Sequence, residues 1–178
     1  MRSRRASHGG ARPLNCGVRR HVKGRYPFEP RSARTLRSGE FWAIPLSDGT
    51  YGCGVVVSPA SVAPGASRVL FLAGLLDWHS TVAPSPAAIA GAGCLAQAKL
   101  HYEGIAYLGS KILGVRTEPL EPWYFRGANH PENSHVLRGL DLLRPQLADD
   151  DCLPVISVWG YNVPRILAEK RFLARSTG

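Results

Sequence analysis

The feature that most constrains the fold of this chain is a β-hairpin signal in residues 39–57, GEFWAIPLSDGTYGCGVVV. Residues 41–46 are apolar and rich in aromatic and branched side chains, as is typical of a strand. The dipeptide Asp48-Gly49 then predicts a tight turn, because glycine tolerates the positive φ angle that such turns require. A second strand follows at once.

The second strand alternates between two faces, and one of these faces carries two glycines. We expect Tyr51, Cys53, Val55 and Val57 on one face and Gly52, Gly54 and Val56 on the other. A glycine face lets a second sheet or backbone approach closely, or marks a coil or bulge. The pattern predicts a small, strongly bent sheet or barrel.

The hairpin also resembles a known family. The pattern F-x-x-IPL-x-DG-x-YG-x-G-x-V, from Phe41 to Val56, is similar to the opening of the bacterial immunity protein 26 family. Beyond it, only the order of elements is similar, to about residue 172. The residues that carry the resemblance are scaffold residues, and most are small or apolar: Ile44, Pro45, Leu46, Asp48, Gly49, Tyr51, Gly52 and Gly54.

The resemblance implies a protein that binds and neutralises a cognate protein toxin in the cytoplasm, without catalysing a reaction. A strand, a D-G turn and a glycine-rich strand also open SH3-like barrels of other functions. The alternative is therefore an SH3-like nucleic-acid-binding module that uses the basic N-terminal segment.

The positive charge of the chain is concentrated at its N-terminus. Residues 1–38 hold 11 Lys or Arg and one acid, Glu29, whereas residues 39–178 hold 11 Lys or Arg and 12 acids. The first segment has few large apolar residues, so it cannot offset the entropy cost of ordering. We expect a disordered basic tail at 1–38, one globular domain at 39–173, and a disordered C-terminus at 174–178.

Three explanations of the tail remain open: a start codon placed too far upstream, a basic arm for nucleic acid or an acidic membrane, or a targeting peptide. The tail lacks the apolar core of a secretory signal. No apolar run of the chain approaches the length of a membrane span. We therefore expect no membrane partner. The cysteines Cys16, Cys53, Cys94 and Cys152 form no C-x-x-C pair, which favours reduced, buried thiols in a cytoplasmic protein.

Strand patterns follow the hairpin. Residues 68–76 form an apolar run of strand length, and residues 97–102 alternate with Ala98, Leu100 and Tyr102 inward. Shorter strands are expected at 112–115 and 155–159, with a loop or edge segment at 118–125.

Helix patterns gather late in the chain. Residues 87–95 predict a short, weak Ala-rich helix. Asn133 or Ser134 is expected to cap a helix whose apolar face is Val136, Leu140, Leu143 and Leu147. Asn162 is expected to cap a final helix with Pro164 in its first turn and Val163, Ile166, Leu167 and Lys170 on one face. The fold class is α+β: a bent antiparallel sheet or partial SH3-like barrel, with two or three helices mostly in the C-terminal third.

The sequence offers no convincing catalytic or metal-binding pattern. His130 and His135 are five residues apart across a proline, which is poor zinc geometry. Adjacent residues cannot form a catalytic triad, so the run Asp77-Trp78-His79-Ser80 is not one. Glu118 and Glu121 lie in a proline-rich setting that gives no reason for raised pKa values. We expect a protein that is not an enzyme and uses no cofactor.

Two features suit the binding of a partner. Tryptophan is enriched in interface hot spots, although the four tryptophans lie in apolar runs typical of a core. The second feature is a set of acids that would steer a basic toxin and occupy its phosphate site, or else form a solvated turn. Its members are Glu132, Asp141, Asp149, Asp150 and Asp151.

Overall fold

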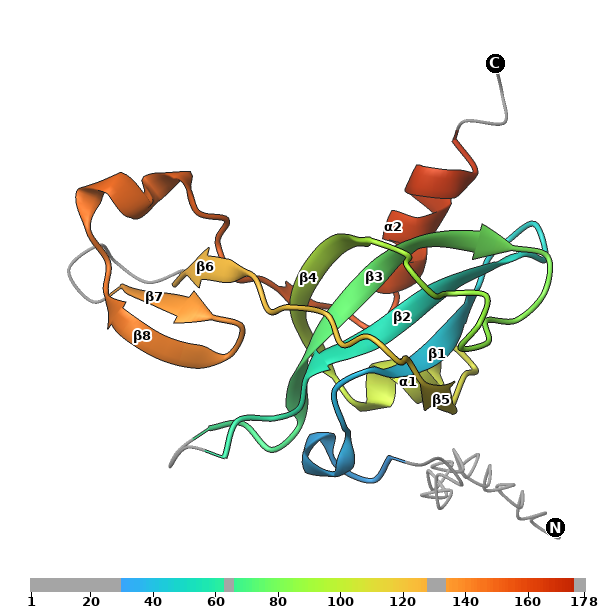
Figure 1. The fold of residues 1–178 in the computed structure, drawn as a ribbon, viewed down its shortest axis with the longest axis horizontal. Helices are drawn as coiled ribbons and strands as arrows, with labels where there is room; N and C mark the ends of the chain where they lie inside the picture. The colour runs from blue at the N-terminus through green and yellow to red at the C-terminus, as the bar shows by residue number, and fades with distance from the viewer. Residues whose placement is uncertain (1–29, 63–65, 128–133, 175–178) are drawn as a thin grey trace, which may run out of the picture.

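The computed structural model describes residues 30–62, 66–127 and 134–174, which form two β-sheets and two α-helices (Figure 1). The α+β class is confirmed. Helix α1 spans Glu103–Tyr107 and helix α2 spans Val163–Phe172, while η1 (Ala33–Thr35) and η3 (Ala148–Cys152) are 3-10 turns. The strands are β1 (Glu40–Pro45), β2 (Tyr51–Ser58), β3 (Leu70–Ser80), β4 (Cys94–His101), β5 (Ile112–Val115), β6 (Tyr124–Arg126), β7 (His135–Arg138), β8 (Asp141–Pro145) and β9 (Val158–Trp159).

The hairpin predicted from the sequence is β1–β2. Its register pairs Phe41 with Val55 and Pro45 with Tyr51. Gly49 has a φ angle of 84°, as the turn requires. The Asp48 carboxylate accepts the Thr50 N–H at 3.0 Å and the Thr50 hydroxyl at 2.6 Å, and these bonds lower the pKa of Asp48. Local residues thus set the conformation of the turn.

We expect Gly49→Val to destabilise the protein by about 1–2 kcal/mol, because a β-branched residue is strained at positive φ. No atom lies within 4 Å of the position a Cβ would take at Gly49, so the cost comes from the backbone alone. Gly49→Asn is the matched control and is expected to cost less, since asparagine adopts this conformation more readily. Urea unfolding measures both, and a valine cost below about 0.5 kcal/mol would contradict the turn assignment.

The six-stranded sheet has the order β5-β1-β2-β3-β4-β9 and is antiparallel except for the β4–β9 pair. Register shifts interrupt the β1–β5, β2–β3 and β3–β4 pairs, and such bulges bend a sheet. The bent sheet is therefore as expected. Strands β5 and β9 remain its two edges and do not pair, so the sheet is open and the SH3-like barrel is not confirmed.

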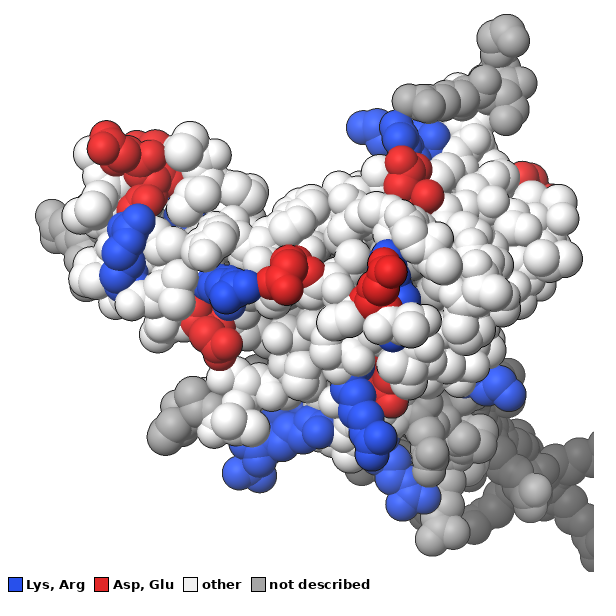
Figure 2. Space-filling view, in the orientation of Figure 1, with Lys and Arg blue, Asp and Glu red and all other residues white. Residues whose placement is uncertain are grey.

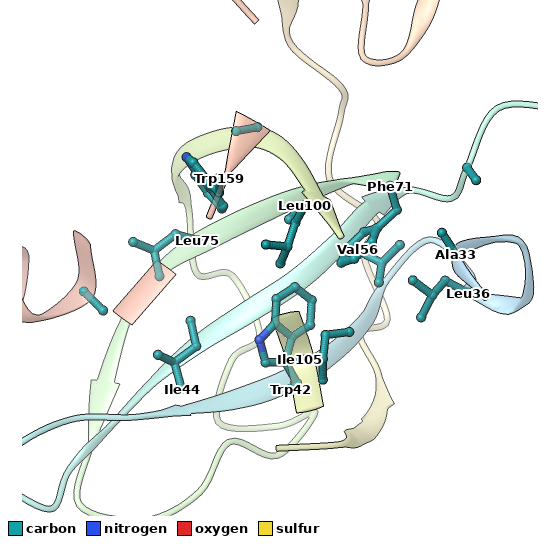
Figure 3. Packing of buried hydrophobic residues seen from close by; sticks show 14 of the residues in the cluster. Ala33, Leu36, Trp42, Ile44, Val56, Phe71, Leu75, Leu100, Ile105 and Trp159 are labelled. Carbon is teal, nitrogen blue, oxygen red and sulfur yellow. The ribbon is translucent and has the colours of Figure 1, made fainter. Parts of the chain in front are cut away.

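One face of this sheet carries the larger apolar cluster, which is centred on Trp42 (Figure 3). Trp42 is fully buried and meets Phe71 edge to face, with ring centroids 5.9 Å apart. The neighbouring Gly54 makes room for it: a Cβ on Gly54 would lie 2.2 Å from the indole Cε2. The glycine face does permit a close approach, but the group that approaches is a side chain of β1.

The opposite face carries a second cluster, which includes Phe41, Val55 and Leu72. Ile89, from the segment between β3 and β4, and Phe125 and Leu137, from the three-stranded sheet, belong to the same cluster. The central strands are thus buried on both faces. This double burial explains why β1, β2 and β3 contain apolar runs with little polar alternation.

Helix α2 packs against β2 at the other glycine of the hairpin. A Cβ on Gly52 would lie 3.3 Å from the Ala168 methyl group. The Ser47 N–H donates to the Glu169 carboxylate at 2.9 Å, which ties the β1–β2 turn to the helix. Asn162 precedes the helix as predicted, but its side chain forms no capping hydrogen bond. The predicted apolar face is wrong for Ile166, which is 52% exposed.

The buried residues of α2 are Pro164 and Ala168. A glycine surface on β2 brings the helix close, so small side chains fit the contact where the larger Ile166 would not. The predicted position of the helix is therefore correct, and Val163 and Leu167 pack against the core as expected, whereas Ile166 faces solvent.

Two other predicted helices are absent from the described residues. Residues 134–147 form the hairpin β7–β8, with Gly139 in the turn at a φ angle of 63°. Leucines at 140, 143 and 147 imitate helical spacing, yet the chain reverses at Gly139 because burial of Val136 and Leu137 outweighs that pattern. Residues 87–91 lie in turns, and β4 already begins at Cys94.

The predicted boundary at residue 39 is also wrong for the preceding segment. Ala33 and Leu36 are 0% and 3% exposed and belong to the cluster around Trp42. The Ser38 hydroxyl donates to the Val57 carbonyl at 2.8 Å, so this segment follows the end of β2. The folded body therefore includes residues 33–38. The predicted disorder at 1–29 and 175–178 lies outside the described residues.

Candidate partner-binding surface

The acids predicted to bind a partner fall on the unit formed by β6, β7, β8 and η3. Asp141 begins β8 and is exposed, and Asp149, Asp150 and Asp151 form most of η3. Glu132 lies outside the described residues. Asp141 pairs with Arg138 beside the Gly139 turn, at the opposite end of β8 from η3, so the described acids lie on one unit but do not form one cluster.

Asp150 serves the fold and is not available to a partner. Its carboxylate accepts two hydrogen bonds from the Arg144 guanidinium, at 2.6 and 2.8 Å, and a third from the Leu147 N–H at 2.8 Å. The Arg144 bonds contribute most to holding the pKa of Asp150 at about 2, below its ordinary value. The residue is 8% exposed. Its role is to fasten η3 to β8.

We expect the stability of the protein to fall as pH drops from about 4 toward 2, and this loss to be smaller in Asp150→Asn. The folded pKa of Asp150 lies below the unfolded one, so its stabilising effect is complete above the unfolded value and disappears as the carboxylate becomes protonated. Urea midpoints measured across this pH range test the expectation.

Asp149→Asn is the matched control, because the Asp149 carboxylate accepts no hydrogen bond from the described residues. This control should keep the pH profile of the unsubstituted protein. An Asp150→Asn profile that is identical to that of the unsubstituted protein would contradict the role of the Arg144–Asp150 pair.

Asp149 and Asp151 remain exposed beside a group of apolar side chains. Every residue of β8 is exposed, and β8 is one of the two edge strands of the small sheet. Leu142 is 68% exposed and Leu143 is 53% exposed, and Leu147, between β8 and η3, is 62% exposed. Exposed apolar side chains that gather on one surface can mark a site where a partner binds. We call these five residues, Leu142, Leu143, Leu147, Asp149 and Asp151, the β8–η3 surface.

Figure 2 shows the acidic part of this surface as a group of Asp and Glu side chains over η3, at the upper left. The small unit protrudes from the main sheet, with η3 at its outer end (Figure 1). Two hydrogen bonds attach this unit to β4 of the main sheet: the Gln97 side chain donates to the Glu121 carbonyl and accepts the Trp123 N–H, both at 3.0 Å. The β8–η3 surface is thus presented on a unit fastened to the core.

The tryptophans divide between core and surface. Trp42 and Trp159 are 0% and 8% exposed, whereas Trp123 is 37% exposed and precedes β6. Tyr124, the first residue of β6, is 51% exposed. Trp123 and Tyr124 are therefore exposed on the same unit as the β8–η3 surface, whereas Tyr107, at 64%, is exposed on α1.

A polar chain at the tip of the β1–β2 hairpin joins residue types found in hydrolases. The Thr50 hydroxyl lies 2.6 Å from Asp48 Oδ1 and 2.6 Å from His79 Nε2, and His79 stacks on Phe172. Because the hydroxyl donates its single proton to the carboxylate, it accepts from the imidazole. These contacts join the β1–β2 turn to β3 and, through the stacking of His79 on Phe172, to α2.

Other groups considered as catalytic also hold the fold together. Asp77 pairs with Arg171 at 3.0 Å, and Glu121 pairs with Arg138 at 2.6 Å. Sequence reasoning missed a cluster around Glu103, whose carboxylate accepts from the hydroxyls of Tyr102 and Tyr161 at 3.4 and 3.1 Å. The aromatic rings of this cluster also pack on one another and join α1 to the turn before α2; they belong to His101, Tyr102, Tyr107 and Tyr161.

Among the described residues, the cysteines and a surface cleft form no further candidate catalytic or ligand site. Burial raises the pKa of the Cys53 thiol to about 12 and also raises that of Cys94. Cys152 is exposed, so its predicted burial is wrong, and Cys16 lies outside the described residues. Among the described residues, no three His, Cys, Asp or Glu gather in a way that would hold a metal ion. A cleft of about 150 Å³ beside Leu70, Lys99 and Leu140 is smaller than the roughly 300 Å³ typical of small-molecule sites.

Comparison with known proteins gives no match among family models, curated proteins or solved structures. No helix in the described part of the chain is both long and apolar enough to cross a membrane.

Proposed function

We propose that this protein is a bacterial immunity protein, which binds a cognate toxin in the cytoplasm and neutralises it without catalysis. The observation that supports the proposal best is the β8–η3 surface. It combines the exposed Leu142 and Leu143 of an edge strand with the exposed carboxylates of Asp149 and Asp151 on η3. The resemblance of the β1–β2 hairpin to the immunity protein 26 family gives the class of partner.

The chemistry of the surface suits a protein partner with a basic face. Leucine side chains that leave water on binding supply affinity, whereas carboxylates at the rim increase the rate of encounter and select a partner of opposite charge. A nuclease has such a face, because it must bind phosphates. An acidic partner seated there would block access of the nucleic acid.

Co-expression with a toxin encoded by a neighbouring gene tests the proposal. A gene with a variable C-terminal domain directly upstream is the toxin to use, and the protein is expected to rescue growth. Leu142→Arg and Leu143→Arg together should abolish rescue and weaken binding by tenfold or more, because each places a repelling charge in the contact.

The matched control is Val82→Arg with Ile166→Arg. These two apolar residues are exposed to a similar degree, at 63% and 52%, but lie outside the small unit. The control should rescue as well as the unsubstituted protein. Equal loss in both double variants would contradict the assignment of the surface, and absence of rescue by the unsubstituted protein would contradict the function.

A further inference from the structure

A second surface of the protein is defined by arginines that have no acidic partner among the described residues. Of the ten arginines among the described residues, four form ion pairs, Arg126 donates to a backbone carbonyl and Arg116 is buried. The other four are all exposed, and none forms an ion pair with the described residues. They are Arg31, Arg34, Arg37 and Arg68, which we call the arginine face.

Contacts between two chain segments bring these four residues together. Arg31, Arg34 and Arg37 occur at every third position across η1. The Ser32 hydroxyl donates to the Arg68 carbonyl at 3.3 Å, which places the start of β3 beside η1. Figure 2 shows Lys and Arg side chains along this lower edge of the molecule, with few acids among them. Glu40 is close in sequence, and its carboxylate accepts the Arg37 N–H at 2.9 Å.

The backbone beneath the arginine face is held by the core. Ala33 and Leu36 are buried on either side of Arg34, and the Ala60 N–H donates to the Ala33 carbonyl at 3.4 Å. The guanidinium groups therefore project from a fixed support, while their own side chains remain free to adjust. This arrangement suits a ligand with several anionic groups spread along a surface, since arginine pairs bidentately with phosphate oxygens.

We propose that the arginine face binds the phosphate backbone of a nucleic acid. Residues 1–29, which precede it directly, add eight Lys or Arg and a single acid, so the basic stretch of sequence continues beyond the described residues. Contacts made to phosphates carry little sequence information. Binding is therefore largely independent of base sequence and falls steeply with salt. The proposal goes beyond toxin binding, and it concerns residues between 31 and 68, which lie far from η3 in the sequence.

Fluorescence anisotropy with a labelled single-stranded oligonucleotide tests the proposal, using the full chain across a range of salt concentrations. The test variant is Arg31→Gln, Arg34→Gln, Arg37→Gln and Arg68→Gln together. Four lost phosphate contacts should lower the slope of log affinity against log salt by about 3, and weaken binding roughly a hundredfold or more at about 0.1 M salt.

The matched control removes the same charge from other described sites: Arg138→Gln, Arg165→Gln, Lys170→Gln and Arg171→Gln. This control should keep at least most of the affinity, and thermal unfolding should show that both variants are folded. Equal weakening in the two variants would show that total charge alone drives binding, and would overturn the proposal.

Two further outcomes also test the nucleic-acid proposal. Absence of binding by the unsubstituted chain at low salt would overturn the proposal. So would capture by vesicles of anionic lipid that depends on the same four arginines without any binding of the oligonucleotide. Leu142→Arg with Leu143→Arg should not weaken oligonucleotide binding, so this test and the toxin test can fail independently.

Discussion

Gly54→Ala is expected to cost about 3 kcal/mol or more, or to prevent folding, although it adds a single methyl group. The added Cβ would lie 2.2 Å from the Trp42 ring, and that ring is fully buried. Overpacking of this kind forces the backbone or the indole to shift. Urea unfolding, or the yield of folded protein, measures the effect.

Gly93→Ala is the matched control, because no atom lies within 4 Å of its Cβ position. Its effect should stay within about 0.5 kcal/mol. A double-mutant cycle with Trp42→Leu gives a further check: the two changes together should cost less than the sum of their separate effects, because the smaller side chain relieves the clash. Strict additivity would show that Trp42 is not what excludes a side chain at Gly54.

Leu36→Ala is the second change with a large expected effect, at about 2–5 kcal/mol of unfolding free energy. Leu36 is 3% exposed in the cluster around Trp42, so its truncation leaves a cavity. Arg34→Ala, in the same segment but exposed, should change stability by less than about 0.5 kcal/mol.

Two truncations extend the test of the N-terminal segment. A chain that lacks residues 1–38 should unfold at a clearly lower temperature than one that lacks only residues 1–29. Equal midpoints would show that residues 30–38 do not support the core, and that the boundary predicted at residue 39 was correct after all.

Local signals in the sequence predicted the parts of the fold that local residues determine. Asp48, Gly49 and Thr50 form the β1–β2 turn by themselves, and the alternation in residues 97–102 indicated β4. The helix wrongly predicted at 134–147 shows the opposite case, in which packing with distant residues overrides the local pattern. Its leucine spacing is helical, but the chain gains more from covering the second face of the main sheet with Leu137 than from a helix.

The candidate surface was predictable only in part, for the same reason. The group of aspartates is visible in the sequence, whereas the pairing of Asp150 with Arg144 depends on how η3 folds back onto β8. The exposure of Leu142 and Leu143 depends on β8 being an edge strand, and a helical interpretation of the same residues buries Leu143. The arginine face could not be predicted from the sequence, because two apolar residues, Ala33 and Leu36, are too few to indicate a packed segment.

The burial of the main sheet on both faces has a consequence for how this protein can diversify. A substitution in β1, β2 or β3 disturbs one apolar cluster or the other, so these strands tolerate little change. The exposed Leu142 and Leu143 of β8 are free of that constraint, and changes there cost little stability. Under the proposed function, such contact residues can be exchanged to follow a changing partner while the scaffold, with its glycine-lined hairpin, stays the same.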